Sequence, residues 1–141
     1  MSNINMGRVV LGGLVAGLVM NVGEVVLNEF ILGPQMKTFY DQHNLVVPGT
    51  AFLVTAVVLT FILGIVLVLG YACIRPRFGP GPKTAIIAGL SLWFAVYCYS
   101  GVIQTHLFGV PAPSVLPLYL GLGLVEYSLA ALAGSYFYKE A

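Results

Sequence analysis

Four long apolar blocks follow one another along the chain, separated by shorter segments rich in proline, glycine or polar residues. They cover about residues 8–32, 51–74, 84–108 and 116–138. Each block reaches the roughly 20 residues that an α-helix needs to cross a hydrocarbon core about 30 Å thick. The pattern therefore predicts an all-α fold, in which residues 1–141 form one integral membrane domain built as a four-helix bundle.

Proline and glycine are concentrated in the connections between the blocks. The connection RPRFGPGPK, residues 75–83, is expected to form a tight turn, because its three prolines and two glycines do not continue a helix. The first connection is longer, and Pro34 is expected to begin a short helix there. That helix would carry Met36, Phe39 and Tyr40 on one side, and it would rest on the bilayer surface or cap the bundle.

Basic residues gather at one end of the predicted bundle. Only Lys37 lies in a connection at the opposite end. Lys and Arg near membrane spans are retained on the cytoplasmic side, so both termini are predicted to be cytoplasmic. The other five basic residues support this orientation: Arg8, Arg75, Arg77, Lys83 and Lys139.

The composition agrees with a membrane protein and argues against several other classes. Hydrophobic residues make up 59% of the chain and charged residues 8%, with a mean hydropathy of +0.96, whereas a typical soluble domain is about 25% charged. The net charge of +1 is too small to indicate a nucleic-acid partner. Cys73 and Cys98 form no CxxC pair, so neither redox chemistry nor a structural disulfide is expected.

The third block is similar to the first when the two are aligned without a gap. Glycines then coincide, Gly13 with Gly89 and Gly33 with Gly109, while Asn21, Glu24 and Asn28 fall on Tyr97, Ser100 and Gln104. The similarity favours two tandem helical hairpins, related by an axis along the membrane normal. The alternative is that packed helices acquired small and polar residues independently.

One face of the first block carries both small and polar residues. At about 100° per residue, five side chains lie within an arc of about 80°: Gly13, Gly17, Asn21, Glu24 and Asn28. Its two glycines form a GxxxG pattern, which lets a neighbouring helix backbone approach closely. The third block has a matching face formed by Gly89, Trp93, Tyr97, Ser100 and Gln104. We expect these two faces to pack against each other.

Glu24 most needs an explanation, because an acidic side chain near the bilayer centre costs about 2.5 to 3.5 kcal/mol. It is expected to face the bundle interior as a protonated acid that donates a hydrogen bond to Asn28, Ser100 or Gln104. Glu126 lies near the middle of the fourth block, again with no Lys or Arg at a similar depth. The carboxyl groups and their polar neighbours form either a ligand- or proton-binding site or a hydrogen-bonded latch between helices.

The sequence carries no motif for catalysis or for a cofactor. A glycine-rich phosphate loop, a nucleophile elbow and an HExxH zinc motif are all missing, so no enzymatic activity and no cofactor are expected. His43 and His106 fall at the outer end of the predicted bundle, where they could approach Glu29 and Asp41 and bind a transition metal. Their spacing defines no particular site, so an interfacial or solvent-facing role is favoured over a metal site.

Two stretches, GRVVLGGLVAGLVMNVGEVVLNE in the first block and RPRFGPGPKTAIIAGL at the second connection, resemble small uncharacterised bacterial membrane proteins with four spans. The resemblance covers most of the chain. It implies a multi-pass protein of the bacterial inner membrane, and it implies no activity and no catalytic residue.

Two functions are favoured by these features, ahead of a third, a membrane enzyme with a metal near His43 and His106. The first is a non-enzymatic accessory subunit that packs into a homo-oligomer or a larger membrane complex, with lipids and other membrane subunits as its partners. The alternative is a small transporter or binding protein for a proton, a cation or an amphipathic ligand, using the carboxyl groups inside the membrane.

Overall fold

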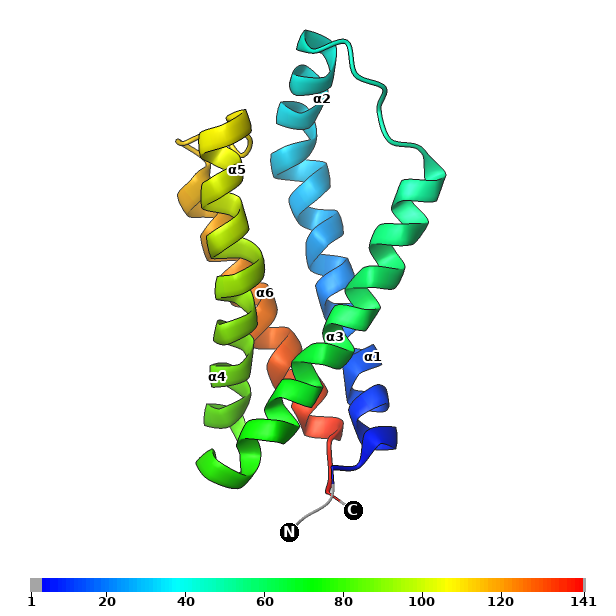
Figure 1. Cartoon of the computed structure of the whole chain (residues 1–141), viewed down its shortest axis with the longest axis vertical. Helices are drawn as coiled ribbons and strands as arrows, with labels where there is room; N and C mark the ends of the chain where they lie inside the picture. Colours follow the sequence, from blue (N-terminus) through cyan, green and yellow to red (C-terminus); the bar gives the residue numbers. More distant parts are fainter. Residues whose placement is uncertain (1–3, 141) are drawn as a thin grey trace.

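The computed structural model describes residues 4–140, and every regular element in that range is helical (Figure 1). The elements in chain order are α1 (Met6–Leu27), η1 (Asn28–Leu32), α2 (Gly33–Gln42), α3 (Thr50–Phe78), α4 (Pro82–Trp93), η2 (Phe94–Tyr99), α5 (Ser100–Phe108) and α6 (Leu116–Phe137). The two η elements are π-helical turns inside longer helices. The predicted all-α, four-helix architecture is confirmed.

Four continuous helical segments are long and apolar enough to cross a membrane. They are Met6–Gln42, Thr50–Phe78, Pro82–Phe108 and Leu116–Phe137. Large apolar side chains on the outside of the bundle, such as Leu18, Val58 and Leu129, are exposed. Extensive exposed apolar surface of this kind marks a membrane or protein contact. The length, the composition and the exposed surface of these helices together indicate a multi-pass membrane protein.

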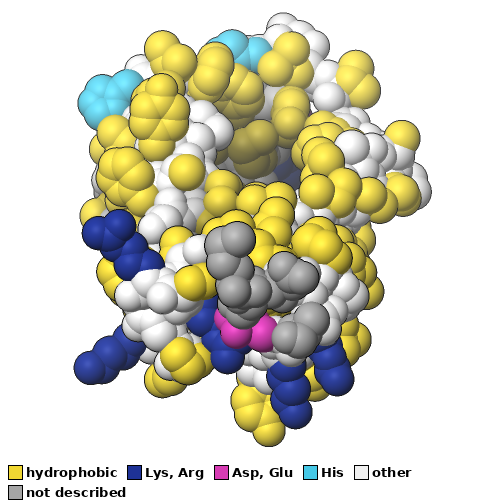
Figure 2. Space-filling view, turned by 60° about the horizontal axis from the view of Figure 1, so that its bottom comes forward, with side chains coloured by type: hydrophobic (Ala, Val, Ile, Leu, Met, Phe, Trp, Pro, Cys, Tyr) yellow, Lys and Arg dark blue, Asp and Glu magenta, His cyan; other side chains and the backbone are white. Residues whose placement is uncertain are grey.

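α1 packs against both α3 and α6, and α4 packs against α6 and α3. Both termini and the α3–α4 turn lie at one end of the bundle, here called the inner end, while α2 and the α5–α6 connection lie at the outer end (Figure 1). Lys and Arg side chains surround the inner end, and histidine side chains lie at the outer end (Figure 2). α3 crosses α1 near the middle of the bundle, and the outer ends of the two helices diverge (Figure 1).

The first span is longer than the apolar pattern predicts. The expected helix beginning at Pro34 exists, but it continues α1 through η1 as one segment and is not a separate surface helix. Within this segment the backbone N–H of Gly33 bonds to the carbonyl oxygen of Asn28, five residues earlier. A π-helical turn of this kind accommodates a proline, which has no N–H to donate, without ending the helix.

The connection at the inner end also differs from its prediction in one respect. Pro76 does not end the second span, because α3 continues through it to Phe78. The chain turns at Gly79 and Gly81, whose φ angles of 82° and 127° lie in a region that other residues rarely adopt.

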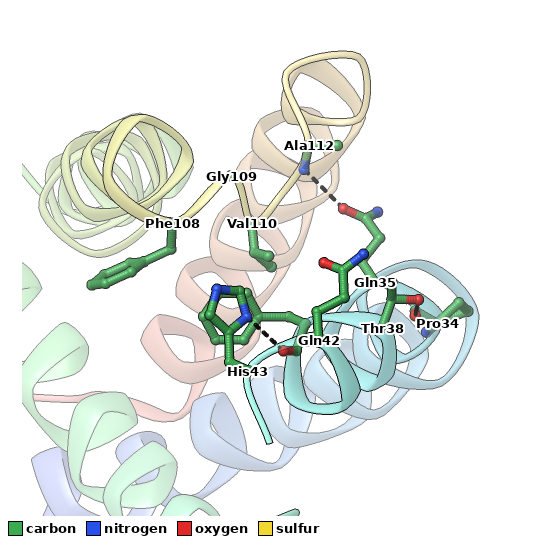
Figure 3. Close-up of a pocket in the computed structure, with 10 residues that line it drawn as sticks. Pro34, Gln35, Thr38, Gln42, His43, Phe108, Gly109, Val110 and Ala112 are labelled. Carbon is green, nitrogen blue, oxygen red and sulfur yellow. Dashed lines mark hydrogen bonds between the residues drawn. The ribbon is translucent and has the colours of Figure 1, made fainter. Parts of the chain in front are cut away.

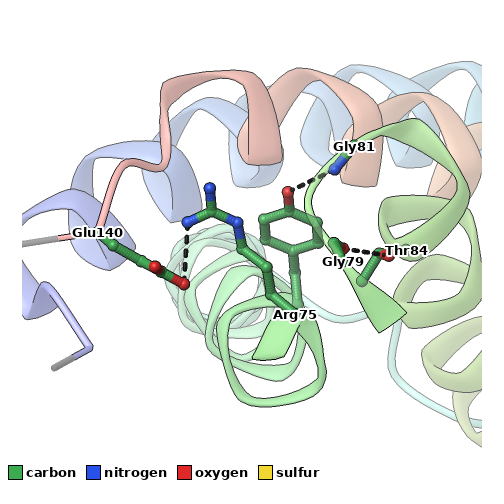
Figure 4. Close-up of polar contacts among 6 residues, drawn as sticks. Arg75, Gly79, Gly81, Thr84 and Glu140 are labelled. Atoms are coloured by element: carbon green, nitrogen blue, oxygen red, sulfur yellow. Dashed lines mark hydrogen bonds and ion pairs between the residues drawn. The ribbon is translucent and has the colours of Figure 1, made fainter. Parts of the chain in front are cut away.

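Polar contacts hold this turn in place (Figure 4). The backbone N–H of Gly81 donates to the Tyr71 hydroxyl at 3.2 Å, and the Thr84 hydroxyl donates to the carbonyl oxygen of Gly79 at 2.6 Å. Arg75 Nη1 lies 3.0 Å from Glu140 Oε1, which ties the end of α3 to the C-terminal segment.

The GxxxG pattern of α1 packs against α3. A Cβ atom added to Gly17 would lie 2.8 Å from the Cα of Phe61, and one added to Gly13 would lie 2.8 Å from the backbone nitrogen of Ile65. Gly64 of α3 fits between these positions, since its added Cβ would lie 2.8 Å from the Cα of Gly17. The expectation that this half of the face packs against the third span is therefore wrong, because α3, which is the second span, already packs against it.

Candidate functional site

The side chain of Glu24 points into the bundle and meets Tyr97 from the third span. The Tyr97 hydroxyl donates to Glu24 Oε1 at 2.8 Å. Asn28 donates to the other carboxyl oxygen, Oε2, at 3.3 Å, and also to the backbone carbonyl oxygen of Glu24 at 2.7 Å. Both carboxyl oxygens of Glu24 thus accept hydrogen bonds, whereas the sequence led us to expect Glu24 as a donor.

Glu126 reaches the same tyrosine from α6. Its Oε2 atom lies 3.3 Å from the Tyr97 hydroxyl, and the residue is only 8% exposed. Its Oε1 atom is buried and has no hydrogen-bond partner among the described residues. The carboxyl groups of the first and fourth spans therefore meet at one hydroxyl group of the third, and we call Glu24, Tyr97 and Glu126 the carboxyl cluster.

Two glycines make room for this cluster. A side chain at Gly23 would collide with the carboxyl group of Glu126, and one at Gly123 would collide with the ring of Tyr97. Because α1 and α6 each carry a glycine at this depth, the long side chains can cross between the helices.

Two further tyrosines surround the ring of Tyr97. The Tyr119 ring lies 4.7 Å from it at 31°, and the Tyr127 ring lies 5.3 Å from it at 75°, both measured between centroids. Tyr97 and Tyr127 are each 1% exposed. The aromatic contacts fix the ring of Tyr97, so that its hydroxyl is held between the two carboxyl groups.

The hydrogen bonds of the cluster restrict where its protons can lie. A tyrosine hydroxyl donates one hydrogen bond and can accept others. Tyr97 donates to Glu24 at the shorter distance, so a proton on Glu126 would let that carboxyl group donate to the Tyr97 oxygen in return. In that arrangement the cluster carries one proton on a carboxyl group and one negative charge, the latter on Glu24.

Among residues 4–140, no cationic side chain forms an ion pair with the cluster. Within residues 4–140 the one ion pair joins Arg75 to Glu140 at the inner end, where other Lys and Arg side chains also lie (Figure 2). Two carboxylates so close together in a medium of low dielectric constant cannot both remain charged without a cation. The cluster therefore has to hold at least one proton or another cation.

Glu24 borders two adjoining hollows, both of which have α3 as one wall. The larger, about 520 Å³, is also lined by Thr60, Leu63, Val96 and Tyr127 among others, and we call it the α3 cleft. The smaller, about 400 Å³, is lined by polar residues of the first span as well: Asn21, Asn28 and Glu29. Figure 2 shows the surface of the bundle hollowed between hydrophobic walls. Glu24 is thus accessible from the side of the bundle.

The remaining residues of the two predicted faces do not join the cluster. Asn21 donates to the carbonyl oxygen of Gly17 at 2.8 Å, and the Ser100 hydroxyl bonds to the carbonyl oxygen of Val96, each within its own helix. Gln104 is exposed. Gly89 packs against α6, where an added Cβ would lie 2.8 Å from the carbonyl oxygen of Tyr127.

The histidines do not form a metal site in the described part of the chain. No group of three or more His, Cys, Asp or Glu side chains that could hold a metal ion occurs in residues 4–140. His43 lines a separate hollow of about 400 Å³ at the outer end, together with Gln35 and Phe108 (Figure 3). Each imidazole Nδ1 lies near a carbonyl oxygen of its own helix, 2.9 Å for His43 and 2.8 Å for His106.

Sequence reasoning missed the contribution of Tyr119 and Tyr127 and the convergence of the two glutamates. A signal was present, because Tyr119, Gly123, Glu126 and Tyr127 lie within an arc of about 100° on one helix. A face with aromatic rings, a carboxyl group and a glycine predicts a buried polar contact with a neighbouring helix.

Comparison of the chain with protein-family models, with curated proteins and with solved structures gave no match.

Proposed function

We propose that this protein binds a proton or another monovalent cation at the carboxyl cluster inside the membrane, as a small transporter or binding protein. The observation that carries the proposal is the convergence of Glu24 and Glu126 on the single hydroxyl of Tyr97, with no ion-paired Lys or Arg at the cluster in the part of the chain that the structure describes. Such a pair holds its second negative charge only when a cation is present, so its charge depends on what it binds. Intramembrane carboxyl groups of this kind are characteristic of ion and proton pathways.

A hydrogen-bonded latch alone explains the cluster less well. A latch needs one donor and one acceptor between two helices, and Tyr97 alone would supply the donor for Glu24. Here a second carboxyl group is brought to the same hydroxyl, and its Oε1 atom is buried without a partner. An unsatisfied buried oxygen costs stability, which favours a binding role over a purely structural one.

The second candidate is an accessory subunit of a homo-oligomer or a larger membrane complex. It is favoured by Asn28, Glu29 and Gln104, which are polar and exposed on the outer halves of their helices. Contact with another subunit would cover these side chains where acyl chains would otherwise meet them. The mass of the protein purified in mild detergent tests this candidate, which predicts an oligomer or a stable complex and not a monomer.

The proposed setting is the inner membrane of a bacterium, with both termini in the cytoplasm. Five of the six basic residues support this orientation, because they lie toward the end that carries the termini. A C-terminal fusion to green fluorescent protein should be fluorescent, since that protein matures in the cytoplasm, and a dark fusion would reverse the topology.

Infrared spectroscopy tests the proton-binding function directly. The protein in lipid nanodiscs is taken from acidic to alkaline buffer while the carboxyl C=O stretching band is followed. We expect a band that titrates in the wild-type protein and is altered in both Glu24→Gln and Glu126→Gln. A cluster whose carboxyl bands do not respond to pH at all would support the latch and the accessory-subunit function.

A further inference from the structure

The α3 cleft combines an acidic group with apolar walls. Glu24 is its acidic residue, and the side opposite α1 is formed by aliphatic side chains of α3: Leu59, Ile62, Leu63 and Val66. Val96 of η2 completes the apolar lining. The cleft therefore offers one charge-bearing position and a large surface for hydrocarbon.

The carboxyl group of Glu24 in this cleft is connected through Tyr97 to a second, buried carboxyl group, that of Glu126. Glu126 is only 8% exposed, and its Oε1 atom has no partner in the described part of the chain. A cation beside Glu24 would stabilise the ionised carboxyl group and the hydrogen bonds of the whole cluster. The ionised Glu24 therefore favours a positive ligand in this cleft.

Aromatic rings add a second element of cation recognition. Tyr127 lines the α3 cleft beside Glu24, and its ring packs edge-on against Tyr97. The faces of aromatic rings attract organic cations, most strongly when water is excluded. A carboxylate beside one tyrosine side chain is a combination that suits an ammonium or phosphonium group.

The same surroundings do not suit a divalent metal ion. Calcium and magnesium take about six or more oxygen ligands, whereas the lining of the α3 cleft offers only the Glu24 carboxyl group, the Thr60 hydroxyl and the Tyr127 hydroxyl as oxygen-bearing side chains. A charged organic group needs no such coordination shell, and its hydrocarbon part gains from burial against α3.

We propose that the α3 cleft binds an amphipathic organic monocation, which enters from the side of the bundle and places its charged group at Glu24 and its hydrocarbon part against α3. This inference rests on the proposed function and names the ligand class of the same site. The positive charge neutralises Glu24, while the proton on Glu126 stays within the cluster.

Tetraphenylphosphonium is a suitable probe, because tetraphenylborate has the same shape and the opposite charge. Equilibrium dialysis against the protein in nanodiscs of neutral lipid measures the binding of each ion. We expect saturable binding of tetraphenylphosphonium to the protein and only the lipid background for tetraphenylborate. Equal binding of both ions would show apolar partitioning without a site and would overturn the proposal.

Variants locate the site on the chain. Glu24→Gln should weaken tetraphenylphosphonium binding by about tenfold or more, because the charge that attracts the ion is lost. Leu63→Trp should weaken it by filling the cleft while leaving the carboxyl group in place. Glu29→Gln is the matched control, since this exposed carboxyl group lies on the same helix and borders only the smaller hollow. If Glu29→Gln has the effect expected of Glu24→Gln, the site assignment is wrong.

The failures of the two proposals are distinguishable. A cluster that titrates in the infrared experiment but binds no tetraphenylphosphonium leaves the proton-binding function standing and rejects the organic-cation inference. A cluster that does neither rejects both.

Discussion

The hydroxyl of Tyr97 lies 2.8 Å from Glu24 Oε1, which joins the first membrane span to the third through one hydrogen bond. Glu126 of the fourth span lies 3.3 Å from the same hydroxyl. Since three of the four spans meet at one atom, this position couples the packing of the bundle to the charge state of its interior. A change at Tyr97 should therefore affect both stability and the two carboxyl groups.

Replacing Tyr97 with phenylalanine removes the shared hydroxyl and retains the ring. We expect a loss of about 0.6 to 2 kcal/mol in unfolding free energy, the range found for interhelical hydrogen bonds in membrane proteins. Thermal or denaturant unfolding in detergent measures this change. Tyr99→Phe is the matched control, because the neighbouring Tyr99 is 63% exposed and its substitution should have almost no effect. Equal effects of the two substitutions would argue against the cluster.

Replacing Gly64 with alanine should disrupt the contact between α1 and α3. The added methyl group would meet backbone atoms of Gly13 and Gly17, which cannot move independently of their helix. Overpacking of this kind costs about 1 to 3 kcal/mol. Gly70→Ala on the same helix is the control, since nothing lies within 4 Å of its added Cβ, and it should be neutral or slightly stabilising. Unfolding measurements that rank the two variants in the reverse order would contradict the packing described here.

Replacing Gly81 with alanine should destabilise the turn at the inner end. Its φ of 127° is strained for any residue with a Cβ atom, and such strain costs about 1 to 3 kcal/mol. Gly49→Ala tests the same change at a helix N-cap with an ordinary φ of −92°, where little loss is expected. The melting temperatures of the two variants decide the question, and a Gly81→Ala protein as stable as the wild type would refute the turn geometry.

Gly23 should be sensitive to substitution for a different reason. A side chain there would displace the carboxyl group of Glu126, so Gly23→Ala should weaken tetraphenylphosphonium binding even where the protein still folds. Gly121→Ala on α6 provides the control, because no atom lies within 4 Å of its added Cβ. Dialysis of both variants measures the effect, and unchanged binding by a folded Gly23→Ala protein would separate Glu126 from the site.

The number of spans could be predicted from the sequence, because a membrane-crossing helix needs a minimum length of apolar residues. The ends of the spans were less predictable. Pro34 and Pro76 both lie inside helices, since a π-helical turn precedes the first and the second lies in the last turn of α3. The tendency of proline to break a helix therefore does not by itself determine where a helix ends.

The pairing of helix faces was predicted only in part. Periodicity shows which residues share a face, but it does not show which helix that face meets, so the glycines of α1 were assigned to the wrong neighbour. The π-helical turn η2 adds a second difficulty, because its extra residue rotates the following side chains by about 100°. Tyr97 within η2 is buried, whereas Gln104 beyond it is exposed. The predicted hairpin repeat remains a prediction.

The most direct test of the carboxyl cluster is the infrared C–O stretching band of Tyr97, assigned with isotope-labelled tyrosine and its disappearance in Tyr97→Phe. The cluster predicts that this band shifts in Glu24→Gln and shifts again, in its own way, in Glu126→Gln, while Glu29→Gln leaves it unchanged. A Tyr97 band that is the same in all three glutamine variants would show that the two carboxyl groups do not share this hydroxyl.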